Sequence, residues 1–452
     1  MGVVDDLSFA GRFLAARRRF LSWSRERIAS WQLESARRVV RSVIRRSPFF
    51  ADLFRDSDPD DVWRLPITNK KMMMEHLGAY NTLGFTREEL LRFCLEAERE
   101  RTFTRRYRGV NVGMSSGTSG SRGVEMATRG EESHVKAVLL SRFPFPRGEK
   151  LNWAFILRVS SPAFRLNLFG NRLTWVSQLG TAEGIREKLN RLRPNMISAP
   201  PSMLRILARE SRSGLLTARP KCVLSYGEVL YPEVEKYIGE TFSCPVRQVY
   251  KSTEGTIALS CRENRLHMQE DLMAVQLFDR EGRPTPDGEP CHRLVITNLV
   301  YRAQPFIRYE LNDIISLDPH HCPCGSSFRV IDRIQGRCDD VFWADRKDGG
   351  GLQYVFPDYI SRAIISSSDG IEEYQAVQES PGAVLVRILP NGKEQDERIA
   401  EAVASNIIRV FIAYECREPE VRVRFETPVT RGEAGKLIRI RRDFTVEEEI
   451  LR

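Results

Sequence analysis

From about residue 108 to residue 310, short apolar runs alternate with longer stretches in which apolar positions recur at helical spacing. The short runs are rich in β-branched and aromatic residues, which favour strands, and the longer stretches predict helices. The expected strands are 153–159, 195–199, 221–224, 246–250 and 293–297, and the expected helices are 183–192, 201–209 and 232–239. Because strands that alternate with helices usually form a parallel sheet, we expect an α/β fold with flanking helices over mostly parallel strands.

The N-terminal segment, up to about residue 60, predicts helices that end near Ser47 and Pro48. A further helix is expected to begin at Lys70, with Thr68 as its cap. Near residues 336–340 the pattern changes, which predicts a domain boundary. Beyond that boundary, helices at 358–366 and 396–411 and strands at 383–389 and 420–425 indicate a small α+β domain. We therefore expect a large N-terminal domain, 1–338, with 1–75 as a basic helical lead-in, and a C-terminal domain, 339–452.

Positive charge is concentrated in the first 50 residues, which hold 11 arginines against four acidic residues, so most of the net charge of +9 lies there. Arg38, Arg41 and Arg45 recur at helical spacing and predict a basic stripe on an amphipathic helix. Two interpretations remain open: a solvated helix face, or a docking surface for an acidic partner or a nucleotide. The stripe has no interleaved aromatic residues and matches no nucleic-acid-binding module, so it does not favour a nucleic-acid partner.

The length and composition limit the class of protein. A chain of 452 residues exceeds what one compact core normally holds, which agrees with two or three domains. No run approaches the roughly 18 apolar residues that a membrane-spanning helix requires. Asp5 and Asp6 occupy the N-terminus, and no signal-peptide pattern follows them, so a cytoplasmic protein is expected. The nine cysteines are odd in number and scattered, which argues against a disulfide framework.

One segment has the composition of a phosphate-binding loop. Its glycines allow sharp turns that aim backbone N–H groups at one point, its hydroxyls add donors, and its arginine adds a positive charge. The segment reads Ser115, Ser116, Gly117, Thr118, Ser119, Gly120, Ser121, Arg122 and Gly123. It lacks the Gly-Lys-Ser/Thr ending of a Walker loop. A phosphate site and a flexible Gly/Ser surface loop both remain open from these residues alone.

Two further segments place acidic residues at the ends of expected strands. Glu254 follows the expected strand 246–250, where ligands of open α/β sheets bind, and it could hold Mg²⁺ while Thr253 contacts the α-phosphate. Asp313 ends the run 305–313, and its carboxylate could accept both hydroxyls of a ribose. In isolation each segment is equally compatible with a surface turn.

Five segments taken in order carry a resemblance to a known family. They are 115–123, 250–255, 305–313, 336–340 and the Gly435–Lys436 pair. This order and spacing resembles the adenylate-forming superfamily, which includes acyl-CoA synthetases, luciferases and adenylation domains of peptide synthetases. Within it, the chain is most similar to the phenylacetate-CoA ligase and capsule-biosynthesis-like branch. The resemblance covers the chain from about residue 35 to residue 445.

The resemblance implies roles for individual residues. Segment 115–123 resembles the loop that orders around ATP and pyrophosphate. The pair Gly227 and Glu228, preceded by Tyr226 in place of the usual small residue, resembles the adenine-binding segment. The remaining matches are Tyr250 at the adenine, Thr253 at the α-phosphate, Glu254 for Mg²⁺, Asp313 at the ribose, the cofactor-binding Arg337 that follows it in the family's order, the hinge residue Asp339 and the catalytic Lys436. The small domain is then expected to rotate about Asp339.

This family match implies that ATP activates a carboxylic acid as an acyl-adenylate, with transfer to CoA as the expected second step. Two segments depart from the family pattern: Ser121 stands where a lysine is common, and residues 341–346 replace a stretch that shapes the thiol tunnel. An amine, a hydroxyl or a carrier protein therefore remains open as the acceptor. A non-catalytic nucleotide-binding scaffold is the alternative of another class. Four aromatic residues favour an aryl or medium-sized apolar acid if they line the pocket, or they are plain core: Phe164, Phe169, Trp175 and Tyr250.

Cys322 and Cys324 form a Cys-Pro-Cys-Gly string that resembles half of a zinc knuckle. Relatives in this branch often pair such a string with an upstream Cys and His, and Cys261 and His267 fit those positions. Four such ligands would form a closed, tetrahedral structural Zn²⁺ site. The spacing of the two cysteines is shorter than usual, so a tight turn with buried reduced thiols is the other interpretation.

Overall fold

The computed structural model describes residues 3–100, 105–114, 123–143, 145, 148–157, 167–168, 170–178, 180–227, 230, 232–279, 281–289, 291, 293–311, 313, 315–334, 342–355, 359–360, 363–364, 366–368, 370–390, 392, 395–431, 436–437 and 439–444. It divides the chain into two compact units. The larger contains residues 1–113 and 124–336, and the smaller contains residues 114–123 and 337–452.

The larger unit is built on a ten-stranded sheet with the order β14-β15-β10-β9-β8-β7-β6-β3-β5-β4. Its parallel part contains β3 (Asn152–Leu157), β5 (Asn171–Ser177), β6 (Met196–Ala199), β7 (Cys222–Tyr226) and β8 (Val246–Ser252). The antiparallel strands are β4 (Asn167–Leu168), β9 (Gly255–Ser260), β10 (Leu266–Met268), β14 (Ile315–Leu317) and β15 (Val330–Ile334). The α/β fold is thus confirmed, while the antiparallel half of the sheet was not predicted.

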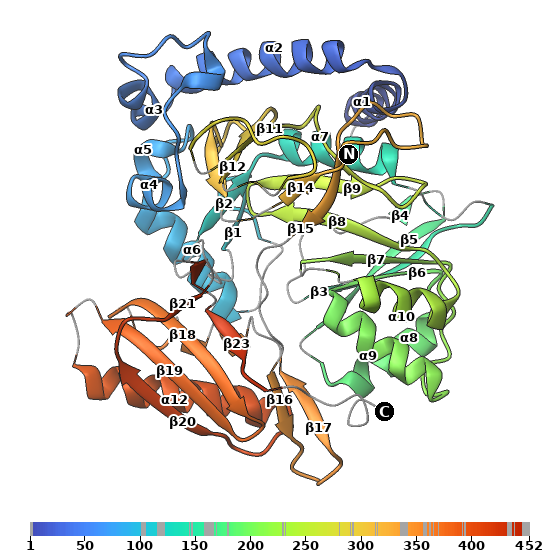
Figure 1. The fold of residues 1–452 in the computed structure, drawn as a ribbon, viewed down its shortest axis with the longest axis vertical. Helices are drawn as coiled ribbons and strands as arrows, with labels where there is room; N and C mark the ends of the chain where they lie inside the picture. Colours follow the sequence, from blue (N-terminus) through green and yellow to red (C-terminus); the bar gives the residue numbers. More distant parts are fainter. Residues whose placement is uncertain are drawn as a thin grey trace. The chain divides into compact units, whose positions relative to one another are not determined.

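Three helices connect the parallel strands and gather beside them in Figure 1: α8 (Ala182–Leu192), α9 (Pro201–Arg212) and α10 (Pro232–Phe242). Each occupies a predicted helical stretch. The start of α8 is fixed by Thr181, whose side chain accepts a hydrogen bond from the backbone of Gly184, and α9 begins with a proline in its first turn. The connections place the carboxyl ends of β7 and β8 at one edge of the sheet.

The predicted strand 293–297 exists as β12 (Arg293–Asn298), but it does not belong to the large sheet. It pairs antiparallel with β11 (Met273–Phe278) and β13 (Tyr309–Leu311) in a separate three-stranded sheet. The apolar content of residues 293–297 predicts a buried strand, but it does not indicate with which strands that strand pairs. A short two-stranded sheet joins β1 (Asn111–Met114) to β2 (Val124–Ala127).

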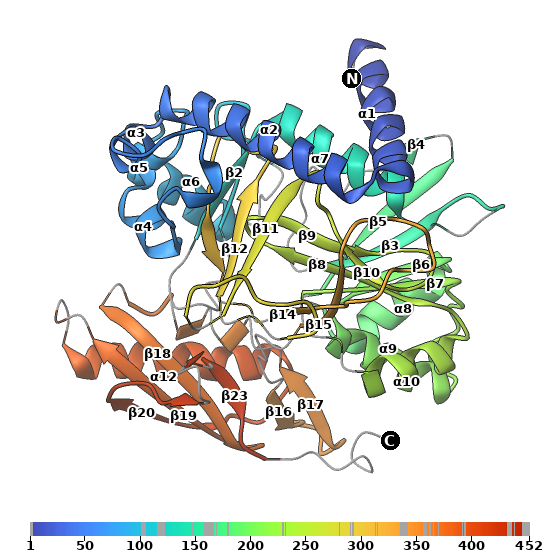
Figure 2. The same ribbon diagram turned by 45° about the horizontal axis from the view of Figure 1, so that its top comes forward.

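The N-terminal lead-in is helical, as the sequence predicted. It consists of α1 (Val3–Ser22), α2 (Arg25–Ile44), α3 (Pro48–Leu53), the 3₁₀ turn η1 (Val62–Arg64), α4 (Lys70–Glu75), α5 (Leu77–Tyr80) and α6 (Arg87–Glu100). In Figure 2, α2 runs along the same side of the larger unit as α7 (Arg129–Arg142). Helix α1 packs on α7 through Ala16 and Val138.

The predicted cap of α4 was wrong by one residue. The side chain of Asn69, not Thr68, accepts the hydrogen bond from the Met72 backbone at 3.0 Å. Thr68 is buried and instead continues a strand-like pairing, because its backbone donates to the Arg308 carbonyl at 2.8 Å. Its hydroxyl also donates to the Ile307 carbonyl. Both residue types cap helices well, so local sequence could not separate them.

The smaller unit has its own core. A four-stranded sheet, β20-β19-β18-β23, packs against α12 (Asp396–Ala413). Its strands are β18 (Ile371–Ser380), β19 (Ala383–Pro390), β20 (Glu420–Phe425) and β23 (Ile440–Arg442), and the unit also contains the pairs β16 (Phe342–Asp345) with β17 (Leu352–Val355) and β21 (Thr430–Arg431) with β22 (Lys436–Leu437). Predicted helix 358–366 lies partly outside the described residues. Across the described part of the chain, no helix is both long and apolar enough to cross a bilayer.

Candidate active site and metal centre

The predicted adenine and phosphate residues follow two neighbouring parallel strands. Tyr226 is the last residue of β7, and Gly227 follows with a φ of +82°, a conformation that glycine adopts readily. The next strand in the sheet, β8, contains Tyr250 and is followed by Thr253 and Glu254. Tyr226 lies opposite Val249 in the register, so these segments meet at the carboxyl edge of the sheet.

Asp313 is held at this edge by a hydrogen bond from Tyr250. The Tyr250 hydroxyl donates to Oδ2 of Asp313 at 2.7 Å, although the two residues are 63 positions apart. Asp313 is only 5% exposed. A buried carboxylate needs donors to offset its lost hydration, and here Tyr250 supplies one while it fixes the direction of the group. The predicted adenine residue and the predicted ribose residue are thus direct neighbours.

The turn that carries Glu254 is rigid because of its neighbours. Gly255 has a φ of +143°, and a Cβ there would approach Asn298 Nδ2 and Met273 Cε to 2.9 Å each. The same Asn298 amide donates to the Glu254 carbonyl at 2.9 Å. Glu254 is 7% exposed, and its carboxylate makes no ion pair with any residue in the described ranges. A buried carboxylate without a salt bridge, carried on a rigid turn, is suited to a cation.

Tyr226 fills space that a small residue would leave open. Its ring stacks on Phe155 with centroids 5.1 Å apart and an interplanar angle of 17°. Its hydroxyl donates to the carbonyl of Ile156 on β3. Phe155 in turn contacts Trp153, and both belong to one apolar cluster along the parallel strands. Tyr226 therefore anchors the end of β7 to the apolar cluster along the parallel strands.

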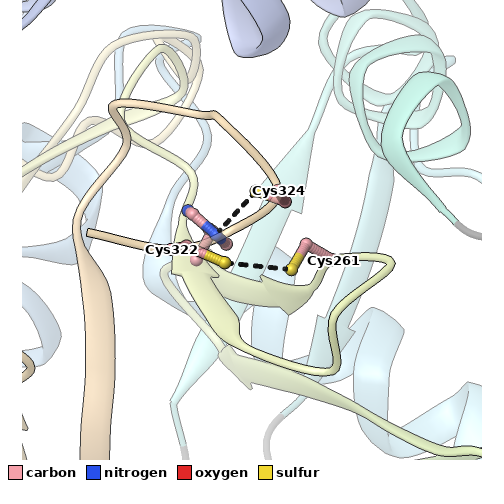
Figure 3. A group of neighbouring side chains, drawn as sticks. Cys261, Cys322 and Cys324 are labelled. Carbon is pink, nitrogen blue, oxygen red and sulfur yellow. Dashed lines mark hydrogen bonds between the residues drawn. The ribbon is translucent and has the colours of Figure 1, made fainter. Parts of the chain in front are cut away.

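The four predicted zinc ligands converge from two distant segments (Figure 3). Their ligand atoms lie within 4.8 Å of one another. The sulfurs of Cys261 and Cys322 are 3.7 Å apart, and Cys324 Sγ is 3.4 Å from His267 Nε2. With Zn–S bonds of about 2.3 Å, two sulfurs at the corners of a tetrahedron lie about 3.8 Å apart. The spacing between the ligands is therefore that of a closed zinc site.

Hydrogen bonding and burial prepare His267 as a ligand. Its Nδ1 lies 2.8 Å from the carbonyl of Phe328, which accepts a hydrogen bond when Nδ1 carries the proton, so Nε2 faces the sulfurs with a lone pair. Burial lowers the pKa of His267 to about 4 and keeps the ring neutral. Burial also raises the pKa of Cys324 to about 12, so without an ion the thiol stays protonated. A metal would displace that proton.

No protein-family model matches the chain. Over 385 residues it is 24% identical to the phenylacetate-coenzyme A ligase of Thermus thermophilus, a match that covers 80% of each protein. It is also 25% identical over 207 residues to protein CapK of Staphylococcus aureus, which covers 45% of this chain and 43% of CapK.

Among solved structures, the chain resembles 2-hydroxyisobutyryl-CoA ligase in complex with 2-HIB-AMP and CoA in the thioesterification state. The TM-score is 0.61 at 18% identity, over 94% of this chain and 92% of that one. The open conformation of the same ligase gives 0.56 at 17% identity, over 92% of both chains. These similarities confirm the predicted resemblance to the adenylate-forming superfamily and, within it, to the phenylacetate-CoA ligase-like branch.

Several residues that the superfamily resemblance assigned lie outside the described residues. They are the whole loop from Ser115 to Arg122, Glu228, Arg337 and Asp339. Lys436 is the first residue of β22, whose backbone is described and whose side chains are not. The structure thus brings together Tyr250 and Asp313 by a hydrogen bond, with Tyr226 and Glu254 on the adjoining strand ends, and the other assignments stay predictions.

Of the four aromatic residues considered for the acid pocket, Phe164 and Phe169 also lie outside the described residues, and Tyr250 donates its hydroxyl to Asp313. Trp175 belongs to β5, and its indole N–H donates to the carbonyl of Leu157 at 2.8 Å. Trp175 therefore fastens the end of β3 to β5, and its part in an acid pocket stays a prediction.

A buried charge network beside the metal centre was not predicted. Asp271 Oδ2 accepts hydrogen bonds from Arg19 at 2.6 Å and from Arg142 at 2.5 Å. Its neighbour Glu270 pairs with Arg329 at 2.9 Å and with Arg25. The sequence shows Glu270 and Asp271 side by side shortly after His267, and this acidic pair was the signal that could have indicated a charge network. Nothing in the sequence indicated which arginines would reach the pair. The network joins α1, α2 and α7 to the segment that follows β10.

Proposed function

We propose that the protein uses ATP to activate a carboxylic acid as an acyl-adenylate and then transfers the acyl group to CoA. The observation that carries the proposal is the hydrogen bond between Tyr250 and Asp313 at the edge where Glu254 also lies. A ring and a carboxylate in contact at a sheet edge suit a nucleoside, and an adjacent carboxylate without a salt bridge suits its Mg²⁺. The relatives that the chain resembles include CoA ligases, which agrees with this proposal.

The residues assigned to the nucleoside, the α-phosphate and Mg²⁺ each have a chemical task in this proposal. Asp313 accepts hydrogen bonds from the ribose hydroxyls, and Tyr250 holds that carboxylate while its ring borders the adenine. Thr253 donates to the α-phosphate, and Glu254 holds Mg²⁺. The bound ion would offset charge on the phosphate oxygens. Tyr226, Gly227 and Glu228 form the other border of the adenine.

The remaining groups act on the phosphates and the acid. The loop 115–123, with Arg122 in place of the more common lysine, donates to the β- and γ-phosphates. Lys436 neutralises the attacking carboxylate and the α-phosphate oxygens, and Arg337 contacts the nucleotide. The carboxylate attacks the α-phosphorus and pyrophosphate leaves, so positioning and charge stabilisation supply the rate. Asp339 is the hinge about which the C-terminal domain turns between the two half-reactions.

The identity of the acceptor rests on a segment that differs from relatives. Residues 342–345 form strand β16, where Phe342, Trp343 and Ala344 are buried. The Trp343 backbone accepts from and donates to the side-chain amide of Gln378. These residues therefore serve the core of the smaller unit. CoA is the acceptor that the CoA-ligase relatives favour, and an amine, a hydroxyl or a carrier protein is the alternative.

The test is a screen of AMP release over aryl and medium-sized apolar acids, with ATP and Mg²⁺ present. CoA-dependent AMP release with at least one acid is the expected result. Release that needs hydroxylamine or another nucleophile, and that CoA does not stimulate, would assign the acceptor to the alternative class. A protein that binds ATP but releases no AMP under any condition would be a nucleotide-binding scaffold.

We further propose that Cys261, His267, Cys322 and Cys324 hold one structural Zn²⁺. Their spacing, the orientation of His267 and the burial of Cys261, His267 and Cys322 support it. The site is closed by the rings of Phe20 and Phe328, so it would take no part in catalysis. Metal analysis of protein purified without a His tag is expected to give about one zinc per chain. Less than half an equivalent in protein that is fully folded would favour buried reduced thiols.

A further inference from the structure

Two cavities in the larger unit, both open to solvent, share the side chain of Arg46, which follows α2. The first has a volume of about 340 Å³ and is lined from α1, α7 and the connection after β12. The second has a volume of about 290 Å³ and lies along the exposed face of α2 and its end, where it is lined by Arg38, Arg41, Ser42, Arg45 and Arg46. None of the described residues assigned to ATP lines either cavity.

The lining is strongly basic. Five of its arginines make no ion pair with any acidic residue in the part of the chain that the structure describes: Arg12, Arg38, Arg45, Arg46 and Arg302. A sixth, Arg41, is paired with Asp60 at 2.8 Å. Guanidinium groups without a salt bridge around a concave surface attract anions, and their planar geometry suits phosphate.

Glu131 is the one carboxylate among the lining residues of the first cavity, and its lone pairs are already occupied. Its Oε1 accepts from the backbone N–H groups of Arg302 at 2.6 Å and Ala303 at 3.0 Å. Its Oε2 accepts from the backbone and the hydroxyl of Thr128. Glu131 therefore braces the wall of the cavity by joining the start of α7 to the connection after β12.

Other polar groups complete the first cavity. It includes the first turn of α7, where the positive end of a 14-residue helix favours negative charge, and the hydroxyls of Thr82 and Thr128. His134 also lines it. Burial, reinforced by the positive charges of Arg12 and Arg19, lowers the pKa of His134 to about 4. His134 is therefore neutral near pH 7 and adds no positive charge of its own to the lining.

Thr128, which lines the first cavity, is separated from Gly123 by the length of β2. This strand begins just after Gly123, the last residue of the loop, and ends just before Thr128, which lines the cavity. Five residues of extended chain span about 16 Å, so Thr128 lies at the far end of the strand from Gly123.

We propose that the paired cavities bind a small soluble molecule that carries two or more phosphate groups, in addition to the ATP of the catalytic site. Two basic lobes that meet at Arg46 suit a chain of phosphates better than a single anion. The basic stripe of α2 then has a specific use, because Arg38 and Arg45 line one lobe.

The test is calorimetric titration of the full chain with tripolyphosphate at fixed salt and Mg²⁺, after saturation with a non-hydrolysable ATP analogue. One equivalent is expected to bind despite the analogue, and orthophosphate is expected to bind at least about 10-fold more weakly. Removing one charged hydrogen-bond donor weakens binding roughly 10-fold, so Arg46→Ala should weaken tripolyphosphate by about that factor. Arg12→Ala combined with Arg46→Ala should weaken it about 100-fold. Arg191→Ala, an exposed position on α8, is the matched control and should bind like wild type.

Three results would overturn the proposal. The double variant binds as tightly as the wild type, or the ATP analogue abolishes tripolyphosphate binding. The third is that phosphatidylglycerol vesicles bind while tripolyphosphate does not, which would mean that a lipid surface is the partner. Circular dichroism of each variant shows whether the fold is retained, and binding of the ATP analogue itself shows whether the catalytic site is retained.

Discussion

At the scale of single residues, the assigned chemistry depends on a few side chains whose neighbours are far away in sequence. The sequence could single out Tyr250, Glu254 and Asp313 as candidate site residues, because they lie at the ends of strand-like runs or just after them. Their contact could not, since the bond between Tyr250 and Asp313 depends on how β8 and the residues after β13 meet. The stacking of Tyr226 on Phe155 was equally hidden, because it depends on how strands far apart in the sequence lie in the sheet.

Removing the Tyr250 hydroxyl tests the ribose assignment. In Tyr250→Phe the KM for ATP should rise about 10-fold, because Asp313 loses the donor that orients it. Asp313→Ala should raise it further, by about 100-fold. Steady-state kinetics over a range of ATP concentrations measures both. The control is Tyr237→Phe on α10, which removes a tyrosine hydroxyl away from the site and should leave the KM for ATP unchanged. Equal effects of the two tyrosine substitutions would contradict the assignment.

Lys436 is predicted to act in adenylation only. Lys436→Ala should lower the rate of adenylate formation by about 10² to 10³, the usual cost of losing one preorganised charged group. Thermal unfolding should stay at the wild-type temperature. Lys347→Ala in the same unit is a suitable control, because Lys347 is an exposed residue in the turn between β16 and β17. An equal loss in both variants would mean that Lys436 has no special role.

At the scale of elements, periodicity located most helices and strands, and their partners depended on long-range contacts. Helix α2 could be recognised from its arginines and valines. The attachment of α2 to the segment after β10 could not be predicted, because it depends on hydrogen bonds from Gln32 and Arg25 to Glu270. Glu270 is 238 and 245 positions away from these two residues. The antiparallel extension of the large sheet was missed for the same reason.

The buried pairs of Asp271 predict a pH dependence of stability. Burial by itself would raise the pKa of Asp271, but Arg142 and Arg19 outweigh it, so the net pKa is lowered. The stabilisation is therefore complete above the unfolded pKa and is lost as the pH falls through the lower folded value. Unfolding midpoints measured between about pH 7 and about pH 3 should fall steeply in the wild type below about pH 4.

Asp271→Asn isolates this pair. The substitution leaves two buried arginines without their partner, and the free energy of unfolding of the larger unit should drop by about 3 to 5 kcal/mol at about pH 7. Asp60→Asn removes an exposed partner of Arg41 and should leave the unfolding midpoint nearly unchanged. A wild-type midpoint that does not depend on pH in the acidic range would contradict the role of Asp271.

The zinc ligands make a prediction at the same scale. Cys322→Ser should abolish zinc binding and lower the unfolding temperature of the larger unit, because the ion joins β10 and the turn after β9 to the segment before β15. Cys291→Ser, a buried cysteine outside the cluster, is the control and should keep its zinc. If a strong chelator leaves the unfolding temperature of the wild type unchanged, the cluster has no structural ion.

At the scale of the whole molecule, the chain has two compact units, and its length alone indicated that more than one core was needed. The sequence also placed a change of pattern near the point where the second unit's main segment begins. How the units move relative to each other belongs to the hinge hypothesis. It predicts that Asp339→Pro, which restricts backbone rotation at that position, slows CoA-dependent thioester formation at least about 10-fold while adenylation stays near wild type. Equal loss of both half-reactions would contradict a hinge there.

Adenylation is measured most directly by acid-dependent exchange of radiolabelled pyrophosphate into ATP, scanned over aryl and apolar acids. Exchange is expected with at least one acid, dependent on Mg²⁺ and reduced at least about 100-fold in Lys436→Ala. Absence of exchange with every acid, in protein that binds ATP and is fully folded, would contradict adenylation as the function of this chain.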